Sequence, residues 1–201
     1  MRGSKDMTFN LMIAGVGGQG TVLASKLIAA AAMKKGYEVR TTETIGMAQR
    51  GGSVFGHCRI GENIFSPKIP MGKADAIIAF EPAEAVRQMA FLREGAVVLV
   101  CDNAIKPITD PNAENNYEAA AMLDFLKAQA QKNNMTLVII NGQRLKDQNA
   151  KTTNVSLLGA AVQKGFLPFD ADTLKLVLHE MLPERFLEMN LKAFELGREL
   201  V

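Results

Sequence analysis

The chain has 201 residues, and 48% of them are hydrophobic, which is enough for one domain with a well-buried core. The formal net charge is only +2, so the composition provides no broad basic surface for nucleic acid. No apolar run approaches the ~20 residues that a membrane-spanning helix needs, and we therefore expect no membrane contact.

The cysteine and histidine content narrows the chemistry further. The two cysteines, Cys58 and Cys101, lie far apart in the sequence, which excludes a disulfide framework and suggests a reducing, cytoplasmic environment. Two thiols also cannot supply the four ligands of an iron–sulfur cluster. Because there are only two histidines and no carboxylates at metal-binding spacing, we expect no metal site.

The first residues are short and polar and do not form a secretory signal. The run Met1-Arg2-Gly3-Ser4 resembles the leader of an expression vector. We therefore exclude residues 1–6 from the fold as a leader or tag and predict a single domain over residues 7–201.

An apolar run leads into a glycine-rich turn, and a helical pattern begins directly after it. The glycines have the G-x-G-x-x-G spacing of dinucleotide-binding turns. Glycine permits a sharp turn and the close approach of a ligand, and the free N–H groups at a helix start favour an anion such as a phosphate. The alternative is a turn that only packs the helix against the sheet. The candidate binding residues of this turn are Gly15, Gly17, Gly18, Gln19 and Gly20.

Strands and helices alternate along the chain. Apolar or alternating runs predict strands at residues 9–16, 37–44, 53–60, 74–80, 95–101 and 136–140. Helical spacing predicts helices at residues 21–35, 83–92, 117–132, 154–164, 172–182 and 184–200, and residues 141–153 form a polar connection. Several strands are apolar on both faces. We therefore predict an α/β fold, with a doubly wound, mostly parallel, Rossmann-like sheet flanked by helices and followed by C-terminal helices.

A second stretch, residues 43–53, carries an acid, an arginine and three glycines, which is more than an ordinary turn requires. One interpretation is a solvated arginine beside glycines that only mark the turn. The functional interpretation is a binding loop in which the arginine is a fixed cation and backbone N–H groups face a ligand or partner. The candidate binding residues of this stretch are Glu43, Arg50, Gly51, Gly52 and Ser53.

The two glycine-bearing stretches together resemble a known family. The residues that carry the resemblance are Gly15-Val16-Gly17-Gly18-Gln19-Gly20 and Met47-Ala48-Gln49-Arg50-Gly51-Gly52-Ser53-Val54, the second preceded by Glu43. Residues 74–75, 80–82 and 154–159 follow in the order that this family shows. The chain resembles the gamma-type subunit or domain of 2-oxoacid:ferredoxin oxidoreductases (the pyruvate/ketoisovalerate oxidoreductase family), and is most similar to the beta (small) subunits of the indolepyruvate type.

The resemblance implies an accessory subunit for the oxidative decarboxylation of a 2-oxoacid, such as indolepyruvate, to its acyl-CoA, with electrons passed to ferredoxin. That chemistry needs thiamine diphosphate and iron–sulfur clusters. Thiamine sites of the family carry a Gly-Asp-Gly element, which this sequence lacks, as it lacks the cysteines for a cluster. We therefore expect a larger partner subunit to hold both groups, with ferredoxin reached through the complex and coenzyme A as co-substrate.

The resemblance assigns no cofactor to this chain alone and identifies no catalytic residue in it. What remains for the chain is to complete the active-site cleft and to bind coenzyme A, whose phosphates suit helix N-terminal amides and an arginine. We therefore expect residues 17–20 and 50–53 to form one anion-binding or partner-facing mouth at the carboxyl ends of the strands.

Two other classes of protein remain open. An independent NAD(P)-binding protein would use Glu43, which lies at about the right distance after the glycines to bind a ribose hydroxyl. An assembly module would use the C-terminal helices, which carry Met181, Phe186 and Phe194, unless this apolar face packs onto the sheet.

Overall fold

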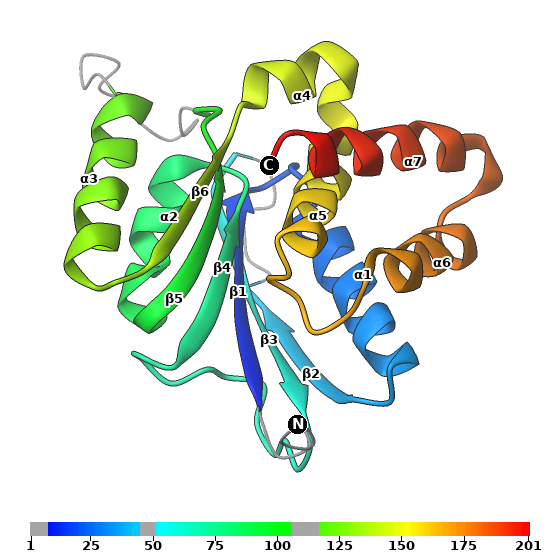
Figure 1. The fold of residues 1–201 in the computed structure, drawn as a ribbon, viewed down its shortest axis with the longest axis horizontal. Coiled ribbons are helices and arrows are strands. Elements are labelled where there is room, and N and C mark those ends of the chain that lie inside the picture. Colours follow the sequence, from blue (N-terminus) through cyan, green and yellow to red (C-terminus); the bar gives the residue numbers. More distant parts are fainter. Residues whose placement is uncertain (1–7, 45–50, 106–116) are drawn as a thin grey trace.

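The computed structural model describes residues 8–44, 51–105 and 117–201, and it has a central sheet between two layers of helices (Figure 1). The strands are β1 (Phe9–Val16), β2 (Glu38–Glu43), β3 (Ser53–Gly61), β4 (Ala74–Ala79), β5 (Leu92–Cys101) and β6 (Thr136–Ile140). The helices are α1 (Thr21–Lys34), α2 (Pro82–Gln88), α3 (Ala119–Lys132), α4 (Gly142–Asn149), α5 (Thr153–Gln163), α6 (Ala171–Met181) and α7 (Glu184–Glu199), with 3-10 turns η3 (Met89–Phe91) and η4 (Ala150–Thr152). This confirms the predicted α/β class.

The sheet is mostly parallel, as predicted, and its strand order is β2-β3-β1-β4-β5-β6. Strands β1, β4, β5 and β6 pair in parallel. Strand β3 is antiparallel to both of its neighbours, and β2 therefore runs in the same direction as β1. The short connection suits this reversal, because residues 44–52 are too few for the crossover of a dozen or more residues that joins parallel strands, whereas antiparallel strands need only a short turn. Strand β3 is thus inserted between β1 and β2.

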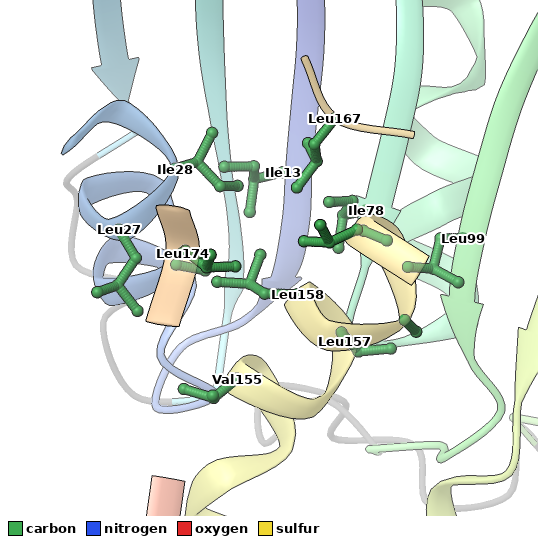
Figure 2. Close-up of a cluster of buried hydrophobic side chains, with 14 of the residues drawn as sticks. Ile13, Leu27, Ile28, Ile78, Leu99, Val155, Leu157, Leu158, Leu167 and Leu174 are labelled. Carbon is green, nitrogen blue, oxygen red and sulfur yellow. The ribbon is translucent and has the colours of Figure 1, made fainter. Parts of the chain in front are cut away.

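Helices cover both faces of the sheet. In Figure 1, α1, α5, α6 and α7 lie on one side, while α2 and α3 lie on the other. Because side chains alternate along a strand, Leu11 and Ile13 of β1 join the core under α1 and α5, whereas Met12 and Ala14 join the core under α2 and α3. Figure 2 shows Leu158 of α5 close to Ile13 in the larger core. This double burial explains the continuous apolar runs of the central strands.

The region 141–153, predicted only as a polar connection, contains the helix α4 and the turn η4. Helix α4 begins after Asn141, whose side chain caps it by accepting the Arg144 N–H at 3.0 Å. The helix buries only Gly142 and Leu145, so its sequence lacks the apolar stripe by which helices are recognised.

Helix α2 is shorter than the predicted span 83–92. Pro82 occupies its first turn, and the Glu81 carboxylate caps it by accepting the Glu84 N–H at 3.0 Å. The helix ends at Gln88, because the chain tightens into the 3-10 turn η3 and enters β5 directly after that turn.

The C-terminal helices turn most of their apolar face inward. Phe194 is fully buried, and Leu182 and Leu191 pack at the edge of the same core. Met181 and Phe186 stay 41% exposed near the turn between α6 and α7. Within the described ranges, neither these nor the other helices have the length and hydropathy needed to cross a membrane.

Two glycines allow α7 to lie directly on α5. An added Cβ at Gly159 would overlap the carbonyl oxygen of Phe194, and one at Gly197 would overlap the carbonyl oxygen of Ser156. The two helix backbones are therefore in contact, which a residue with a side chain would prevent at either position.

We predict that Gly197→Ala lowers the free energy of unfolding by about 3 kcal/mol or more, the upper end of the usual overpacking cost, because backbone rather than a flexible side chain must move. Urea denaturation measures the change. Lys192→Ala on the exposed face of α7 is the matched control and should stay within ~0.5 kcal/mol of the parent. Equal stability of Gly197→Ala and the parent would contradict direct backbone contact between α5 and α7.

Candidate functional site

The glycine turn after β1 and the described end of the second stretch, residues 51–53, lie side by side at the carboxyl end of β1. The Gly17 N–H donates to the Gly52 carbonyl oxygen at 2.8 Å, and the Gly51 N–H donates to the Gly17 carbonyl oxygen at 3.3 Å. These hydrogen bonds extend the antiparallel ladder between β1 and β3 beyond the ends of both strands. The structure therefore brings the glycine turn and residues 51–53 together at the carboxyl ends of the parallel strands, where ligands bind in open α/β folds.

The glycines of the first stretch have different roles. A Cβ at Gly15 would lie 3.0 Å from the Phe80 ring, and Gly20, at φ +80°, leaves no room for one beside the Asn154 amide of α5. Gly18 has φ +100° and nothing within 4 Å of its Cβ position. Gly15 and Gly20 thus serve packing, and Gly18 faces open space. The packing interpretation therefore holds for Gly15 and Gly20, and ligand binding stays a prediction for Gly18.

Gln19 holds the turn together. Its side-chain Oε1 accepts the Val16 N–H at 2.6 Å, and its Nε2 donates to the Phe80 carbonyl oxygen at 2.9 Å. The side chain thereby joins the carboxyl ends of β1 and β4. Since both polar atoms are engaged within the chain, Gln19 is suited to positioning the turn and not to binding a ligand with its side chain.

Two hollows flank the ridge formed by Gly17 and Gly18. The hollow toward α4, which we call the α4 chamber, has a volume of about 540 Å³ and includes Lys146 and Thr153 in its wall. The hollow toward β3, which we call the β3 chamber, has a volume of about 400 Å³ and includes Val54. The two chambers give the glycine turn room for a ligand on either side.

Lys146 was missed by sequence reasoning, because α4 was not predicted. Asn141 was the one local signal, since an asparagine beside a glycine can cap a helix. With the helix in place, its last turn carries Lys146 to the wall of the α4 chamber.

Two buried carboxylates, Glu81 and Glu84, lie beside the turn and were also missed as a pair. Glu81 and Glu84 are only 1% and 2% exposed. Tyr117 donates its hydroxyl hydrogen to Glu81, and Ser53 donates to Glu84 at 2.6 Å. Arg87 forms an ion pair with Glu84. The Glu-Pro-x-Glu pattern at a helix start was the available signal, since acids in a first turn cap the helix.

The environment of this cluster shifts two pKa values upward. Burial raises the pKa of Glu81, and the Tyr117 hydrogen bond opposes that shift only in part. Burial, followed by the hydrogen bond to Glu81, raises the pKa of Tyr117. Because Tyr117 stays protonated, it remains a hydrogen-bond donor to Glu81 and acts as a structural link at the end of β4.

The remaining predicted residues are placed as follows. Glu43 ends β2 and pairs with Gly56 of β3, so a whole strand separates it from β1, a distance of about 10 Å at ordinary strand spacing. That separation disfavours the NAD(P) interpretation, in which the acid follows a strand adjacent to the glycine turn. The hydroxyl of Ser53 is engaged by Glu84. Arg50 lies outside the described residues.

The cysteines and His57 show no arrangement for catalysis. Burial raises the pKa of Cys58 to about 12 and that of Cys101 to about 11, which keeps both thiols protonated and poorly nucleophilic. His57 Nδ1 accepts the Ile69 N–H at 3.3 Å, and burial lowers its pKa, so this histidine is a neutral packing residue. In the described residues, no group of three His, Cys, Asp or Glu side chains could hold a metal ion.

The fold and the glycine turn define a Rossmann-like α/β protein with its candidate site at the carboxyl ends of the parallel strands. A family model described as pyruvate ferredoxin/flavodoxin oxidoreductase matches residues 10–200, and the chain belongs to this family. It is a subunit of a 2-oxoacid:ferredoxin oxidoreductase, as predicted.

Similar proteins agree with this assignment. The indolepyruvate oxidoreductase subunit IorB of Pyrococcus horikoshii is 35% identical over 94% of both chains. The pyruvate/ketoisovalerate oxidoreductases common subunit gamma of Thermococcus kodakarensis is 29% identical over 74% of both chains.

Solved structures share the fold. The gamma subunit of a keto/oxoacid ferredoxin oxidoreductase from Geobacter sulfurreducens has a TM-score of 0.66 at 23% identity and covers 95% of this chain and 96% of its own. A 2-oxoglutarate:ferredoxin oxidoreductase from Magnetococcus marinus, solved with 2-oxoglutarate, coenzyme A and succinyl-CoA bound, has a TM-score of 0.70 at 22% identity. It covers 96% of this chain but only 31% of its own, so in that enzyme the same fold is part of a longer polypeptide.

We predict that Gln19→Ala lowers the free energy of unfolding by about 1–3 kcal/mol, because the Val16 N–H and the Phe80 carbonyl lose their partner at the end of the sheet. Urea denaturation followed by circular dichroism measures the loss. Gln131→Ala on exposed α3 is the control and should leave stability nearly unchanged. If both variants unfold at the parent midpoint, Gln19 does not hold the turn.

Proposed function

We propose that this chain is the small subunit of a heteromeric indolepyruvate:ferredoxin oxidoreductase. In this proposal the complex oxidatively decarboxylates an aryl pyruvate to its acyl-CoA and passes the electrons to ferredoxin. The observation that carries the substrate class is the difference between relatives. Those named as indolepyruvate oxidoreductase subunits match nearly the whole chain at 35% identity, whereas the common gamma subunits match 74% of it at 29% or less.

The chain's own residues support an accessory role. Cys58 and Cys101 are both buried, and two thiols are too few for an iron–sulfur cluster. The sequence also has no Gly-Asp-Gly element of the kind that holds thiamine diphosphate in this family. We therefore assign thiamine diphosphate, the clusters and the contact with ferredoxin to a larger partner subunit.

The part of this chain in the reaction is to complete the active-site cleft and to bind coenzyme A. The hydrogen bonds between Gly17 and the segment 51–52 support this part of the proposal, because Gly17 and Gly18 lie between the two chambers and Gly51 adds to the wall of the α4 chamber. Coenzyme A carries several phosphate groups, which suit backbone N–H groups and cationic side chains.

We expect the tagged chain, purified anaerobically from its native cells, to bring down a larger subunit with the visible absorbance of iron–sulfur clusters. The complex should reduce a viologen dye when given indolepyruvate and coenzyme A together. Pyruvate, 2-oxoisovalerate and 2-oxoglutarate are the comparison substrates. A higher kcat/KM for indolepyruvate than for these three supports the aryl-pyruvate class.

Two results would contradict the proposal at different levels. A complex that prefers an aliphatic 2-oxoacid would remove the indolepyruvate assignment. A colourless homo-oligomer without a larger partner would remove the accessory-subunit role, and the glycine turn would then be tested against NAD, FAD and AMP.

The second candidate stretch has its own test. We predict that Arg50→Ala weakens either coenzyme A binding or the affinity for the larger subunit, because a cationic side chain next to Gly51 and Gly52 in the sequence suits an anionic partner. Isothermal titration measures both affinities. Arg40→Ala on β2 is the control for loss of a positive charge. Unchanged affinity of Arg50→Ala for both would show that the arginine is only solvated.

A further inference from the structure

Charge distinguishes the two chambers beside the glycine ridge. Lys146 lies in the wall of the α4 chamber. The described residues in the wall of the β3 chamber, including Thr44 and Val54, are glycine, threonine and valine and carry no charge. If the cleft binds an anion, the described part of the chain thus offers a cation on one side of the ridge and none on the other.

Contacts at the start of α4 determine where the backbone of Lys146 lies. Gly142 begins α4 in direct contact with the end of β5, where an added Cβ would lie 2.6 Å from Asn103 Cβ and 2.7 Å from Cys101 Sγ. The Gly142 N–H donates to Asp102 Oδ1 at 2.7 Å, which fixes the helix start to the strand end. A helix anchored at its first residue fixes the backbone of Lys146, one turn later, and the exposed Lys146 side chain forms part of the chamber wall.

The two carboxylates that act on the Cys101 thiol at the end of β5 each have a partner other than Lys146. These carboxylates belong to Asp102 and Glu81, and both raise the pKa of that thiol. Asp102 is engaged by Gly142, and Glu81 by Tyr117. Among the ion pairs of the described residues, Lys146 takes no part.

The other walls of the α4 chamber suit a ligand with an anionic end and a less polar body. Gly18 offers open backbone on the ridge, and Thr153 and Asn103 offer polar side chains. Val16 and Ile105 add apolar surface.

From these observations we propose that Lys146 is the anion-binding residue of the cleft, and that it holds a phosphate or carboxylate of a co-substrate in the α4 chamber. The proposal rests on the proposed function for the identity of that co-substrate: the anion is a phosphate of coenzyme A or the carboxylate of the 2-oxoacid. It places the ligand on the α4 side of the ridge, away from Glu43 and the β2 edge.

The test uses the full complex with Lys146→Ala, Lys146→Arg and a control, Lys151→Ala, which removes an exposed lysine of η4 outside the chamber. Steady-state KM and kcat are measured separately for coenzyme A and for indolepyruvate. We expect Lys146→Ala to raise the KM of one co-substrate by about 10-fold or more, since a charge-assisted hydrogen bond is lost. Lys146→Arg should keep this KM close to the parent value, and Lys151→Ala should have the same KM values as the parent.

Measuring KM for the two co-substrates separately shows which of them supplies the anion. A raised KM for coenzyme A identifies a phosphate, which is the 3′-phosphate if the rise is smaller with dephospho-coenzyme A and the pyrophosphate if the rise is equal. A raised KM for indolepyruvate identifies the carboxylate. Unchanged KM values for both in an active, fully assembled complex overturn the Lys146 proposal and leave the proposed function standing. If no active complex exists, the proposed function fails, and titration of the full chain with pyrophosphate decides Lys146 by itself: weaker binding by Lys146→Ala than by Lys151→Ala supports the proposal, and equal or absent binding overturns it.

Discussion

Close backbone contact at glycines is the constraint on which the rest of this structure depends. Gly20 lets the start of α1 meet Asn154 of α5, and Gly159 lets α5 meet the backbone of α7. Gly142 does the same between α4 and the end of β5. These contacts set where the helices stand relative to the strand ends, and they therefore define the cleft before any functional side chain is considered. Replacing such a glycine moves backbone, not only a side chain.

The cleft shows how a familiar glycine spacing can be used in a different way. In a dinucleotide-binding turn the N–H groups and glycines face the ligand. Here the Gly17 N–H is engaged by Gly52, and Gly15 and Gly20 serve packing. In the dinucleotide-binding fold, the acidic residue follows a parallel strand that is adjacent to the glycine turn. Here β3 occupies that adjacent position, so Glu43 lies on β2, the outermost strand of the sheet. These two differences disfavour the binding of a dinucleotide at this turn.

The buried carboxylates Glu81 and Glu84 connect the cleft to the helical layer formed by α2 and α3. Removing two acids from water is costly, and such groups persist where each has hydrogen-bond partners. Glu81 has Tyr117 and Glu84 has Ser53, so each acid fixes a residue from a segment beside the cleft. Together with the Gln19 bridge, this network joins the ends of β1, β3 and β4 into one rigid frame.

The sequence by itself determined the α/β class, most element positions and the two stretches that meet at the site, because apolar periodicity and glycine spacing are local properties of the chain. It did not reveal α4, whose polar sequence hides it, and hence it missed Lys146. It also did not reveal that β3 runs antiparallel between β1 and β2, nor which glycines pack and which stay open. Only the tertiary structure decided these points, because strand order, burial of the Glu81–Glu84 pair and the placing of Lys146 depend on contacts between residues far apart in the sequence.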